Sequence, residues 1–441
     1  MKPIGRREFF RNSAGAAAAL SLLAPGKSVP ASDRVRIGIM GVGGRGTQLA
    51  GWFAAMPDVE VAYLCDVNQR RFERSLEAVS AHQDYEPELV TDFRRILDDP
   101  EVDALVNATP DHWHALGAIM ACRAGKDVYV EKPLSLNIWE GAQMVRAARK
   151  YERVVQVGLQ CRSSAYAAAA AEFIKSGGIG DVHLAEVVFQ MQHPAVPKGD
   201  EQPVPPGLDW DMWCGPGPLV PYSPGRWWFE RWDYSTGGIA GDAVHQLDLA
   251  RMLLDIGYPE AAYADGGVRH FDDGREIPDT QIATFEYGGL TLLFKATLWT
   301  PYMKKIPHSI RDSDTIPAWE NCSTKIVVQG TAGMMNFGRH GGGWQVYDEN
   351  YELVRTEPGR QGDAAHLRNF IDCVRSRELP AADVEQGHIS TLLCHLSNVS
   401  CRVGNRKLVF DPRNQSFPGD PEANAYLGRT YREPWVVPAE V

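Results

Sequence analysis

Glycines at a characteristic spacing near the start of the chain predict a phosphate-binding turn. Gly41, Gly43 and Gly46 follow the apolar run 35–40 and open a segment of helical character. Glycine permits a tight turn, and the N-terminus of the following helix would face a pyrophosphate. Asp66 comes 20 residues after Gly46, at the end of a second apolar run, where a carboxylate binds ribose hydroxyls. This arrangement predicts a dinucleotide site; the alternative is a glycine-rich turn in a nucleotide-free domain.

The type of nucleotide follows from the charges around the expected ribose. The carboxylate of Asp66 would repel a 2′-phosphate, so the sequence favours NAD over NADP. Arg70 and Arg71 are close in the sequence and weaken that preference, because arginine is a usual partner of the 2′-phosphate. Gly44 and Arg45, inside the turn, are included in the expected site.

Alternating strands and helices place the turn in a parallel sheet. Short apolar runs alternate with helical segments, which is typical of a sheet with helices on both faces. The runs span 35–40, 59–65, 104–108, 127–131 and 154–159. We therefore predict an α/β Rossmann dinucleotide-binding domain over residues 33–160.

The pattern changes after this domain. Long strands joined by the hairpin Gly288-Gly289 predict an antiparallel sheet, with strands at 182–191, 280–287 and 290–298. We expect an α+β substrate and oligomerisation domain over 161–410, with a large, mostly antiparallel open sheet, and a tail over 411–441. The segment 194–238 is rich in Pro, Gly and Trp and is expected to form a long ordered loop.

Residues 1–31 have the composition of an export signal. Arg6 and Arg7 precede the apolar run 14–24, which is too short to cross a bilayer as a stable helix. These features are typical of a twin-arginine signal; the alternative is a short tail with a chance arginine pair. The signal predicts a periplasmic protein that folds around its cofactor before export, retains the nucleotide tightly and has no membrane contact after cleavage.

Composition excludes several function classes. The formal net charge is −11 and no basic run is present, which argues against a nucleic-acid partner and is compatible with a sugar. The eight cysteines have no metal-binding spacing, so no metal site is predicted. The sequence contains neither an HExxH motif nor a Gly-x-Ser-x-Gly elbow with partner residues, so it does not support a conventional hydrolase.

A set of short motifs extends from about residue 35 to residue 411. They are ATPDHWH at 108–114, AGKDVYVEKPL at 124–134, VGLQ at 157–160, RS at 162–163, LDWD at 208–211, WCGP at 213–216, GG at 237–238, HQLD at 245–248, EQGH at 385–388 and HLSN at 395–398. Together they resemble the Gfo/Idh/MocA family, the glucose-fructose oxidoreductase and inositol dehydrogenase group. The resemblance implies a small-molecule sugar or glycoside as substrate and a homodimer or homotetramer that pairs open sheet faces.

By this resemblance, Lys132 lies near the nicotinamide and the reacting hydroxyl. Hydride leaves a carbinol carbon only as its O–H proton is withdrawn, and a lysine with a pKa lowered by burial can move that proton. The alternative is a strand-end lysine in solvent or paired with Glu131. We expect the bond from Lys132 to Pro133 to be cis. His114 is expected near the nicotinamide; its alternative role is to cap the helix that starts at residue 115.

His245 is the second expected catalytic residue. Dehydrogenases of the family have Asp-x-Gly-x-His-x-x-Asp, whose first Asp and His form an acid/base pair. Here His245 and Asp248 match, but Gly241 occupies the position of the first Asp and Asp242 is shifted by one. One residue turns a helix by about 100°, so Asp242 is not expected to reach the substrate as the family's first Asp does. Proton transfer would then fall to His245 with Lys132, whereas Asp248 would orient; a purely structural His245 is the alternative.

The remaining expected contacts involve both the cofactor and the substrate. Cofactor contacts are expected from Thr109, Pro110, His114, Glu131, Lys132 and Gln160. Substrate contacts are expected from Arg162 and His245. They are also expected from Trp228, Tyr234 and Trp299, because sugars pack their C–H faces on aromatic rings. The alternative for the aromatic residues is packing in the core or in a dimer.

Three functions are compatible with these residues. The first is an NAD(P)-dependent oxidoreductase that acts on a sugar or glycoside hydroxyl. The second is an NAD-dependent glycosidase, in which transient oxidation at C3 permits elimination of the leaving group, water addition and re-reduction. The third is a non-catalytic sugar-binding protein on the same scaffold. Analysis of the products separates the first two.

Overall fold

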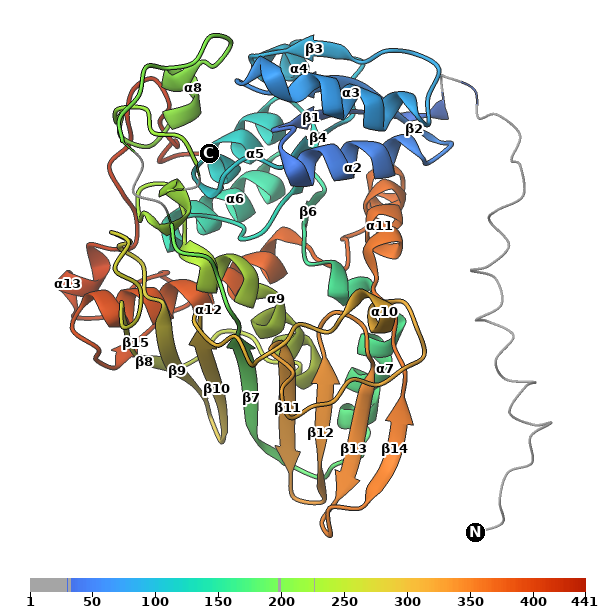
Figure 1. Ribbon diagram of the computed structural model, residues 1–441, viewed down its shortest axis with the longest axis vertical. Coiled ribbons are helices and arrows are strands. Elements are labelled where there is room, and N and C mark those ends of the chain that lie inside the picture. The colour runs from blue at the N-terminus through green and yellow to red at the C-terminus, as the bar shows by residue number, and fades with distance from the viewer. Residues whose placement is uncertain (1–29, 31–32, 197–199, 226) are drawn as a thin grey trace.

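A parallel sheet forms the upper part of the molecule in Figure 1. The computed structural model describes residues 30, 33–196, 200–225 and 227–441, so the expected export signal falls almost entirely outside the described residues. The strands lie in the order β3-β2-β1-β4-β5-β6, each parallel to its neighbours. Their bounds are β1 Val35–Met40, β2 Val59–Cys65, β3 Glu88–Val90, β4 Ala104–Asn107, β5 Asp127–Val130 and β6 Val155–Val157.

Helices cover both faces of this sheet. They are α2 Gly44–Ala54, α3 Phe72–Ser80, α4 Arg94–Asp98, α5 His114–Arg123 and α6 Ile138–Lys150, with short 3₁₀ turns η3 Gln69–Arg71, η4 Asp111–Trp113 and η5 Gln160–Ser163. All residues of β1 and β4 except Arg36 are buried, as expected of parallel strands covered on two faces. The predicted Rossmann-type fold is confirmed.

A second sheet forms the lower part of the molecule. Its order is β14-β13-β12-β11-β7-β10-β9-β8-β15. Strands β7 and β10 are parallel and the other neighbouring pairs are antiparallel, which confirms the predicted α+β class. The bounds are β7 Val182–Gln190, β8 Ala261–Gly267, β9 Thr280–Tyr287, β10 Leu290–Thr297, β11 Lys325–Gly330, β12 Gly333–Gly338, β13 Trp344–Asp348, β14 Leu353–Glu357 and β15 Leu408–Val409.

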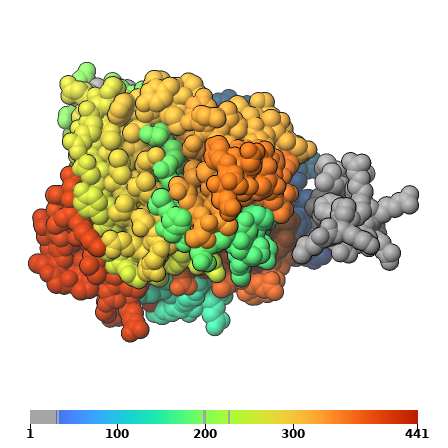
Figure 2. All heavy atoms as spheres, turned by 90° about the horizontal axis from the view of Figure 1, so that it is seen from below, coloured from blue at the N-terminus to red at the C-terminus, as the bar shows by residue number. Residues whose placement is uncertain are grey.

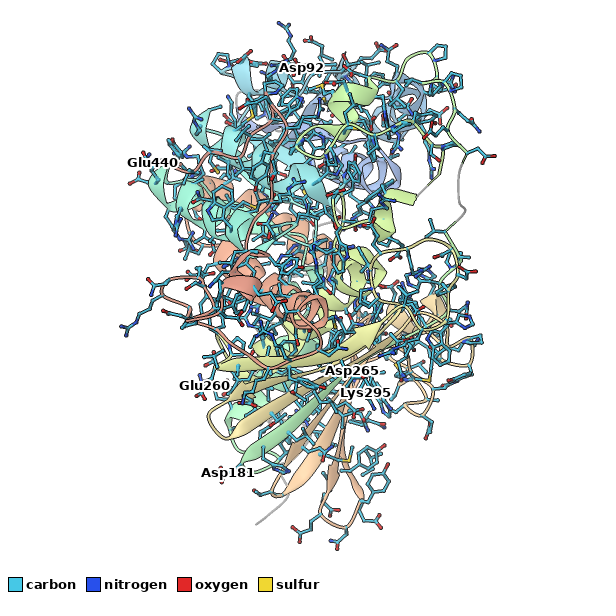
Figure 3. All side chains as sticks on the ribbon, turned by 90° about the vertical axis from the view of Figure 1, so that its left-hand side faces the viewer. Asp92, Asp181, Glu260, Asp265, Lys295 and Glu440 are labelled. Carbon is cyan, nitrogen blue, oxygen red and sulfur yellow. The ribbon has the colours of Figure 1, made fainter. Side chains whose placement is uncertain are left out.

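The second sheet is covered on one face by helices. These are α7 Ala165–Lys175, α9 Gly237–Leu254 and α12 Val384–Arg402. Along β10 buried and half-buried residues alternate, which is the pattern of a strand with one face toward the core. Lys295 and Asp265 lie on the sheet in Figure 3, and Lys295 pairs with Glu186 across the strands at 2.9 Å. From below, the green segment that includes β7 separates the yellow from the orange strands (Figure 2).

One helix that follows the second sheet packs into the core of the first. α11, Asp363–Ser376, lies beneath α2 in Figure 1. The ring of Phe370 is 6.3 Å from that of Phe53 and 5.8 Å from that of Tyr129. The division of the chain into units 33–160 and 161–410 stays a prediction, and this packing shows that the two parts share a core.

The long loop and the tail both return to the Rossmann domain. The loop carries α8 Trp210–Cys214 and η6 Trp227–Glu230; α10 His308–Arg311 and α13 Pro421–Asn424 are further short helices. In the tail, the ring of Trp435 lies 5.1 Å from that of Trp113, and Glu440 reaches the level of the Rossmann helices (Figure 3). Within the described ranges, no helix combines the length and the apolar composition that crossing a bilayer requires.

Candidate active site

The glycine-rich turn lines a cleft of about 540 Å³ at the carboxyl ends of β1, β2 and β4. Gly41 has a φ of +85°, and a Cβ there would lie 2.9 Å from the backbone nitrogen of Thr109. A Cβ at Gly46 would lie 1.8 Å from the carbonyl oxygen of Gly41, so no side chain fits at that position. The lining includes many predicted cofactor residues: Gly41, Gly43, Gly44, Arg45, Asp66, Thr109 and Pro110.

The cleft has the features that a dinucleotide requires. α2 begins at Gly44, and its N-cap residue is Gly43. Glycine has no side chain to cap the helix, so no N-cap side chain competes with a phosphate for the N–H groups of the first turn. A Cβ at Gly44 would meet no atom within 4 Å, which leaves room for a phosphate close to the backbone. These residues fit a pyrophosphate at the start of α2.

Asp66 is fixed at the end of β2 beside an arginine. Its Oδ2 accepts from the backbone N–H of Val42 at 3.0 Å and its Oδ1 from that of Asn68 at 2.9 Å. Burial raises the pKa of the Asp66 carboxyl, and Arg71, 4.0 Å away, opposes that rise. A Cβ at Gly43 would lie 2.4 Å from Nη1 of Arg71. The carboxylate that favours NAD therefore has a cation at the same edge of the cleft.

The long loop forms the other wall of the nucleotide cleft. The backbone N–H of Asp209 donates to the carbonyl oxygen of Val67, and that of Gln69 donates to Gly207, both at 2.9 Å. The cleft lining on this side comprises Met212, Trp213, Gly225 and Trp228. Trp228, predicted to contact substrate, thus lies at the nucleotide end.

Tyr234 packs behind the loop that forms this wall of the cleft. It is 1% exposed, its hydroxyl donates to the carbonyl oxygen of Pro218, and its ring lies 5.1 Å from that of His112. Nε2 of His112 is 2.9 Å from the carbonyl oxygen of Trp213. This packing corrects the expectation that Tyr234 lines an open sugar pocket, because both its ring and its hydroxyl are occupied.

His114 joins two strand-end segments. Nδ1 is 2.7 Å from the carbonyl oxygen of Pro133, and Nε2 is 2.9 Å from that of Thr109. The ring is 1% exposed and stands at the start of α5. Both ring nitrogens therefore lie within hydrogen-bond distance of a backbone carbonyl, and a neutral ring donates to one of the two. The ring packs between the Thr-Pro turn and the Glu-Lys-Pro segment.

Buried Glu131, at the end of β5, pairs with half-buried Arg45. Nε of Arg45 donates to Oε1 of Glu131 at 2.8 Å, and the backbone N–H of Lys132 donates to Oε2 at 3.3 Å. Burial alone would raise the pKa of Glu131, but Arg45 and Lys132 hold it below its usual value. A Cβ at Gly158 would lie 2.9 Å from Oε1, so only glycine leaves room for this carboxylate. Predicted Gln160 donates to the hydroxyl of Tyr129 at 3.3 Å.

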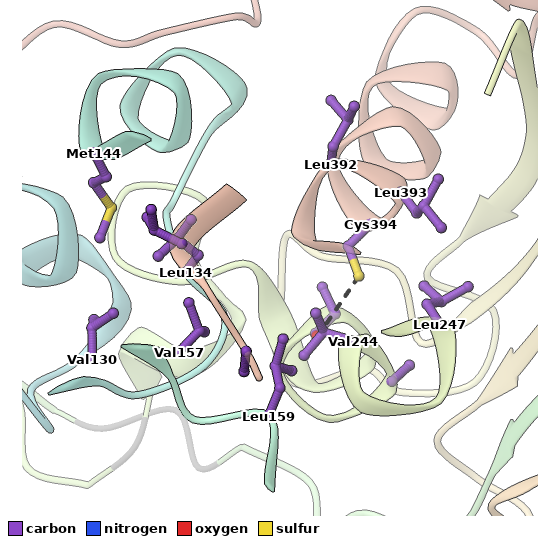
Figure 4. Close-up of a cluster of buried hydrophobic side chains, with 14 of the residues drawn as sticks. Val130, Leu134, Met144, Val157, Leu159, Val244, Leu247, Leu392, Leu393 and Cys394 are labelled. Carbon is purple, nitrogen blue, oxygen red and sulfur yellow. Dashed lines mark hydrogen bonds between the residues drawn. The ribbon is translucent and has the colours of Figure 1, made fainter. Parts of the chain in front are cut away.

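Lys132 lies next to α9. Its Nζ donates to the carbonyl oxygen of Gly241 at 2.6 Å, one helical turn before His245, and its bond to Pro133 is cis, as expected. Buried apolar residues fix the two segments relative to each other (Figure 4). Val130 and Leu134 lie on either side of Lys132 in the sequence, and Val244 and Leu247 lie on either side of His245. All four belong to the same buried cluster.

His245 is buried and neutral. It is 4% exposed, and its Nδ1 has no hydrogen-bond partner within the described part of the chain. Burial, with Arg339 and Lys132 adding to it, holds the pKa of His245 well below 6.5. An uncharged imidazole beside a lysine ammonium can accept a proton from a hydroxyl, which is the requirement for hydride removal.

Asp242 lies on the same side of α9 as His245 but is bonded to two cations. Asp242 and His245 are three residues apart, so they share one side of α9. Oδ1 accepts from Nη1 of Arg339 and Oδ2 from Nζ of Lys305, each at 2.7 Å. These cations hold the pKa of Asp242 well below 3.8 in spite of burial. The one-residue shift therefore leaves Asp242 in the site, but as the partner of two cations.

Two further predicted substrate residues are engaged by the protein. Nε of Arg162 donates to both oxygens of Asp248, at 2.7 and 2.9 Å, and Asp248 also accepts from Ser390. Arg162 is thereby held in an internal ion pair, which agrees with an orienting role for Asp248. Nε1 of Trp299 donates to Thr280 at 2.8 Å, so the role of Trp299 in a sugar pocket stays a prediction.

Sequence reasoning missed the cations around Asp242. Arg339 follows β12, and Lys305 lies in the loop before α10, so both are far from α9 in the sequence. Neither belongs to a motif with a recognisable spacing. The glycine turn 341–343, whose residues all have positive φ, was the available signal that the chain reverses next to Arg339.

Comparisons with known proteins agree with this geometry. The model "Oxidoreductase family, NAD-binding Rossmann fold" of the Gfo/Idh/MocA group matches residues 35–159. The "GFO/IDH/MocA C-terminal domain" matches residues 167–336, and the "Oxidoreductase family, C-terminal alpha/beta domain" matches residues 353–437. Together these matches extend over both sheets and into the tail.

Individual relatives differ in how much of the chain they cover. Glycosyl hydrolase family 109 protein 1 from Shewanella sp. (strain ANA-3) is 30% identical over 177 residues, 35% of this chain and 39% of the relative, so the match spans well under half of that protein. Myo-inositol 2-dehydrogenase from Thermotoga maritima is 25% identical over 371 residues, 83% of this chain and 96% of the relative.

A solved structure shares the fold over most of this chain. The WlbA dehydrogenase from Bordetella pertussis, in complex with NADH and UDP-GlcNAcA, has a TM-score of 0.63 and 21% identity over 86% of this chain and 99% of that chain. From the three family matches and the cleft that they span, the chain belongs to the Gfo/Idh/MocA oxidoreductase family and carries its NAD(H)-binding Rossmann domain.

Proposed function

We propose that this protein is an NAD-dependent oxidoreductase that acts on a sugar or glycoside hydroxyl. The observation that carries the proposal is the contact between Nζ of Lys132 and the carbonyl oxygen of Gly241. It brings the strand-end lysine to the helix that holds His245, beside the nucleotide cleft. A hydroxyl bound between them would meet an ammonium group and a neutral imidazole.

Lys132 and His245 have different roles in the proposed oxidation. Lys132 polarises the hydroxyl oxygen and His245 takes the proton, since its ring is uncharged and its Nδ1 is unoccupied by the described chain. Bound NAD supplies the hydride acceptor. Glu131 is kept ionised by Arg45 and fixes the backbone of Lys132, so it positions that residue.

An NAD-dependent glycosidase is the second candidate. Asp242 favours it, because a carboxylate held by Arg339 and Lys305 is a poor acid/base partner for the family's usual dehydrogenation. The similarity to a glycosyl hydrolase family 109 protein supports the same reading over the aligned part.

One experiment separates the two candidates. Purified protein, without added nucleotide, is incubated with α- and β-linked p-nitrophenyl glycosides, and bound NAD is measured after denaturation. For the oxidoreductase we expect bound NAD, no p-nitrophenol, and NADH formation with the correct sugar. Release of p-nitrophenol without net NADH would favour the glycosidase, and protein with neither nucleotide nor turnover would contradict both.

We propose NAD, not NADP, as the retained nucleotide. Asp66 supports this choice, whereas Arg71 at the same edge opposes it. The loop that closes the cleft supports tight retention, as expected of a cofactor loaded before export. Mass analysis of the nucleotide released from freshly purified protein tests the choice; NADP as the main species would reject it.

We further propose export by the twin-arginine route, a periplasmic location and assembly through the open face of the second sheet. Arg6-Arg7 and the apolar run after them support export. Exposed Tyr263 and Ile282, on β8 and β9, support burial of that face in a dimer or tetramer. Arg6→Lys with Arg7→Lys should leave the protein in the cytoplasm; continued export would reject the assignment.

A further inference from the structure

Positive charge gathers around Lys132, His245 and Asp242, which together form the reaction end of the site. Arg339 and Lys305 both bond to the single carboxylate of Asp242. Arg311 lies close enough to Arg339 and Asp242 to interact electrostatically with both, and Lys132 interacts with both Asp242 and His245. Four cations therefore interact with the carboxylate of Asp242. One of them, Lys132, also interacts with Glu131, which is paired with Arg45. The formal charge of the whole chain is −11, so composition does not account for this local excess.

The carboxylates beyond Asp242 are partly engaged elsewhere. Those that interact with Arg311 are Asp312 and Asp363. Asp312 is exposed at the end of α10, where water screens its charge. Asp363 accepts from Gln361 and lies 3.8 Å from Arg45. The positive charge of the cluster around Asp242 is consequently not fully neutralised by neighbouring carboxylates.

Buried polar atoms in the cluster lack partners in the described chain. Nε of Arg339, Nε2 of Gln246 and Nδ1 of His245 make no hydrogen bond, although these residues are 5%, 0% and 4% exposed. Arg339 and Gln246 are neighbours, since Nη1 of Arg339 donates to Oε1 of Gln246 at 3.3 Å. Buried polar atoms without partners are uncommon in folded proteins, so these groups indicate that a ligand completes the site.

We propose that the substrate is an anionic sugar, whose carboxylate or sulfate group binds the cluster of Lys305, Arg311 and Arg339. This inference rests on the proposed function, because it takes the reacting hydroxyl to lie at Lys132 and His245. Arginine presents donors in a planar fork that matches a carboxylate or an oxyanion ester. Lys305, whose side chain is 38% exposed, provides a cation that an entering ligand can reach.

The charged group also accounts for the position of Asp242. A carboxylate on α9 holds Arg339 and Lys305 in place while the site is empty of substrate. Each of these side chains has more donors than the single bond it makes to Asp242, so an anion can bind them without displacing that residue. A neutral sugar would leave the excess charge unpaired.

Matched pairs of sugars test the proposal. Binding to the NAD-loaded protein is measured by calorimetry for methyl glycosides of gluco, galacto and manno configuration. Each is compared with its uronate and with its 6-sulfate, so that the only change is the anionic group. We expect at least one uronate or sulfate to bind about tenfold or more tightly than its neutral parent, and the advantage to fall in 0.5 M salt. The uronate and sulfate arms distinguish the two anions.

Adjacent lysines give a matched control. Lys305→Met should remove most of the anion preference, measured as the ratio of the affinities for the anionic sugar and its neutral parent. Lys304→Met makes the same charge change in the next residue, whose Nζ donates to Pro301, and should retain the preference. Neutral parents that bind as tightly as the anions, no anion binding across the panel, or an equal loss in both variants would overturn the proposal.

The readout is independent of turnover. If the protein binds anionic sugars but contains no nucleotide and changes no substrate, the proposed function fails and the anion site stands. If it oxidises neutral sugars with no anion preference, the proposed function stands and the anion site fails.

Discussion

The nucleotide cleft and the reaction end are built in different ways. The cleft takes its chemistry from short segments at the ends of neighbouring parallel strands: Gly41 after β1, Asp66 after β2 and Thr109 after β4. The reaction end joins Lys132, after β5, to α9 and to Arg339, after β12. Backbone topology places the first set, whereas long-range packing places the second.

This difference separates what each region tolerates. At the cleft, a Cβ on Gly41 or Gly46 would collide with backbone, so the constraint is steric. At the reaction end, Asp242 and Arg339 hold each other by opposite charge, and burial and Arg339 keep His245 neutral. Substitutions at the cleft should therefore change nucleotide binding, and substitutions at the reaction end should change turnover with the nucleotide still bound.

The largest expected effect is that of Lys132→Ala. Loss of the ammonium removes the group that polarises the hydroxyl, so turnover should fall roughly 100-fold or more. Bound NAD per chain should stay as in the wild type, because Lys132 Nζ contacts Gly241 and not the cleft lining. Turnover and released nucleotide are measured on the same preparation.

Lys150→Ala is the control for this variant, since Lys150 is exposed at the end of α6. It should leave both quantities unchanged. Turnover of Lys132→Ala within a few-fold of the wild type would remove Lys132 from the mechanism. Loss of nucleotide with turnover would instead show that the two regions are not separable.

The next effect concerns pH and a histidine behind the nucleotide wall. Burial lowers the pKa of His112 to about 3. The hydrogen bond to the backbone of Trp213 opposes this shift only in part. The unfolded chain takes up this proton near pH 6.5 and the folded chain does not, so stability is complete above pH 6.5 and declines as pH falls below it. At pH 5 this single histidine should lower the free energy of unfolding by about 2 kcal/mol.

His112→Gln should remove about 2 kcal/mol of the stability lost between pH 7 and pH 5. Denaturant unfolding of the NAD-loaded protein at the two values measures the difference. His308→Gln, at an exposed position of α10, is the matched control. An unchanged pH dependence in His112→Gln would show that His112 charges within the folded protein.

The two regions also differ in how far the sequence predicts them. The cleft glycines and Asp66 were predictable, because spacing after a strand determines where a backbone turn and its carboxylate lie. Trp228 was assigned to the substrate and lines the nucleotide cleft, since a loop without periodicity does not reveal which wall it joins. Arg339 and Lys305 were not found at all, because only tertiary packing brings them to Asp242.

A smaller effect should follow from loosening the wall of the cleft. Arg432, in the tail, donates to Asp211, Gly215 and Gly217 at 2.6 to 3.2 Å, and so holds the segment that carries Met212 and Trp213. Arg432→Ala should speed nucleotide dissociation about tenfold, in line with the loss of hydrogen bonds from a charged group.

Chase of labelled NAD from the loaded protein measures this rate. Arg413→Ala changes an exposed arginine of the same tail and should retain the wild-type rate. An unchanged rate in Arg432→Ala would mean that the wall holds the nucleotide without the tail. Turnover at saturating nucleotide should be unaffected, which keeps this variant on the cleft side of the comparison.

The smallest effect is expected at the residue that the family pattern marks as an acid/base partner. Both oxygens of Asp242 are held by cations, and its pKa lies well below 3.8, so it is a weak base at neutral pH. Asp242→Asn keeps an oxygen for Arg339 and should lower turnover less than tenfold, without a new acid limb in the pH profile. A loss of roughly 100-fold, equal to that of Lys132→Ala, would instead make Asp242 a catalytic residue. The reaction end would then follow the family's acid/base logic, with the cations tuning a reacting carboxylate that shares the proton with His245.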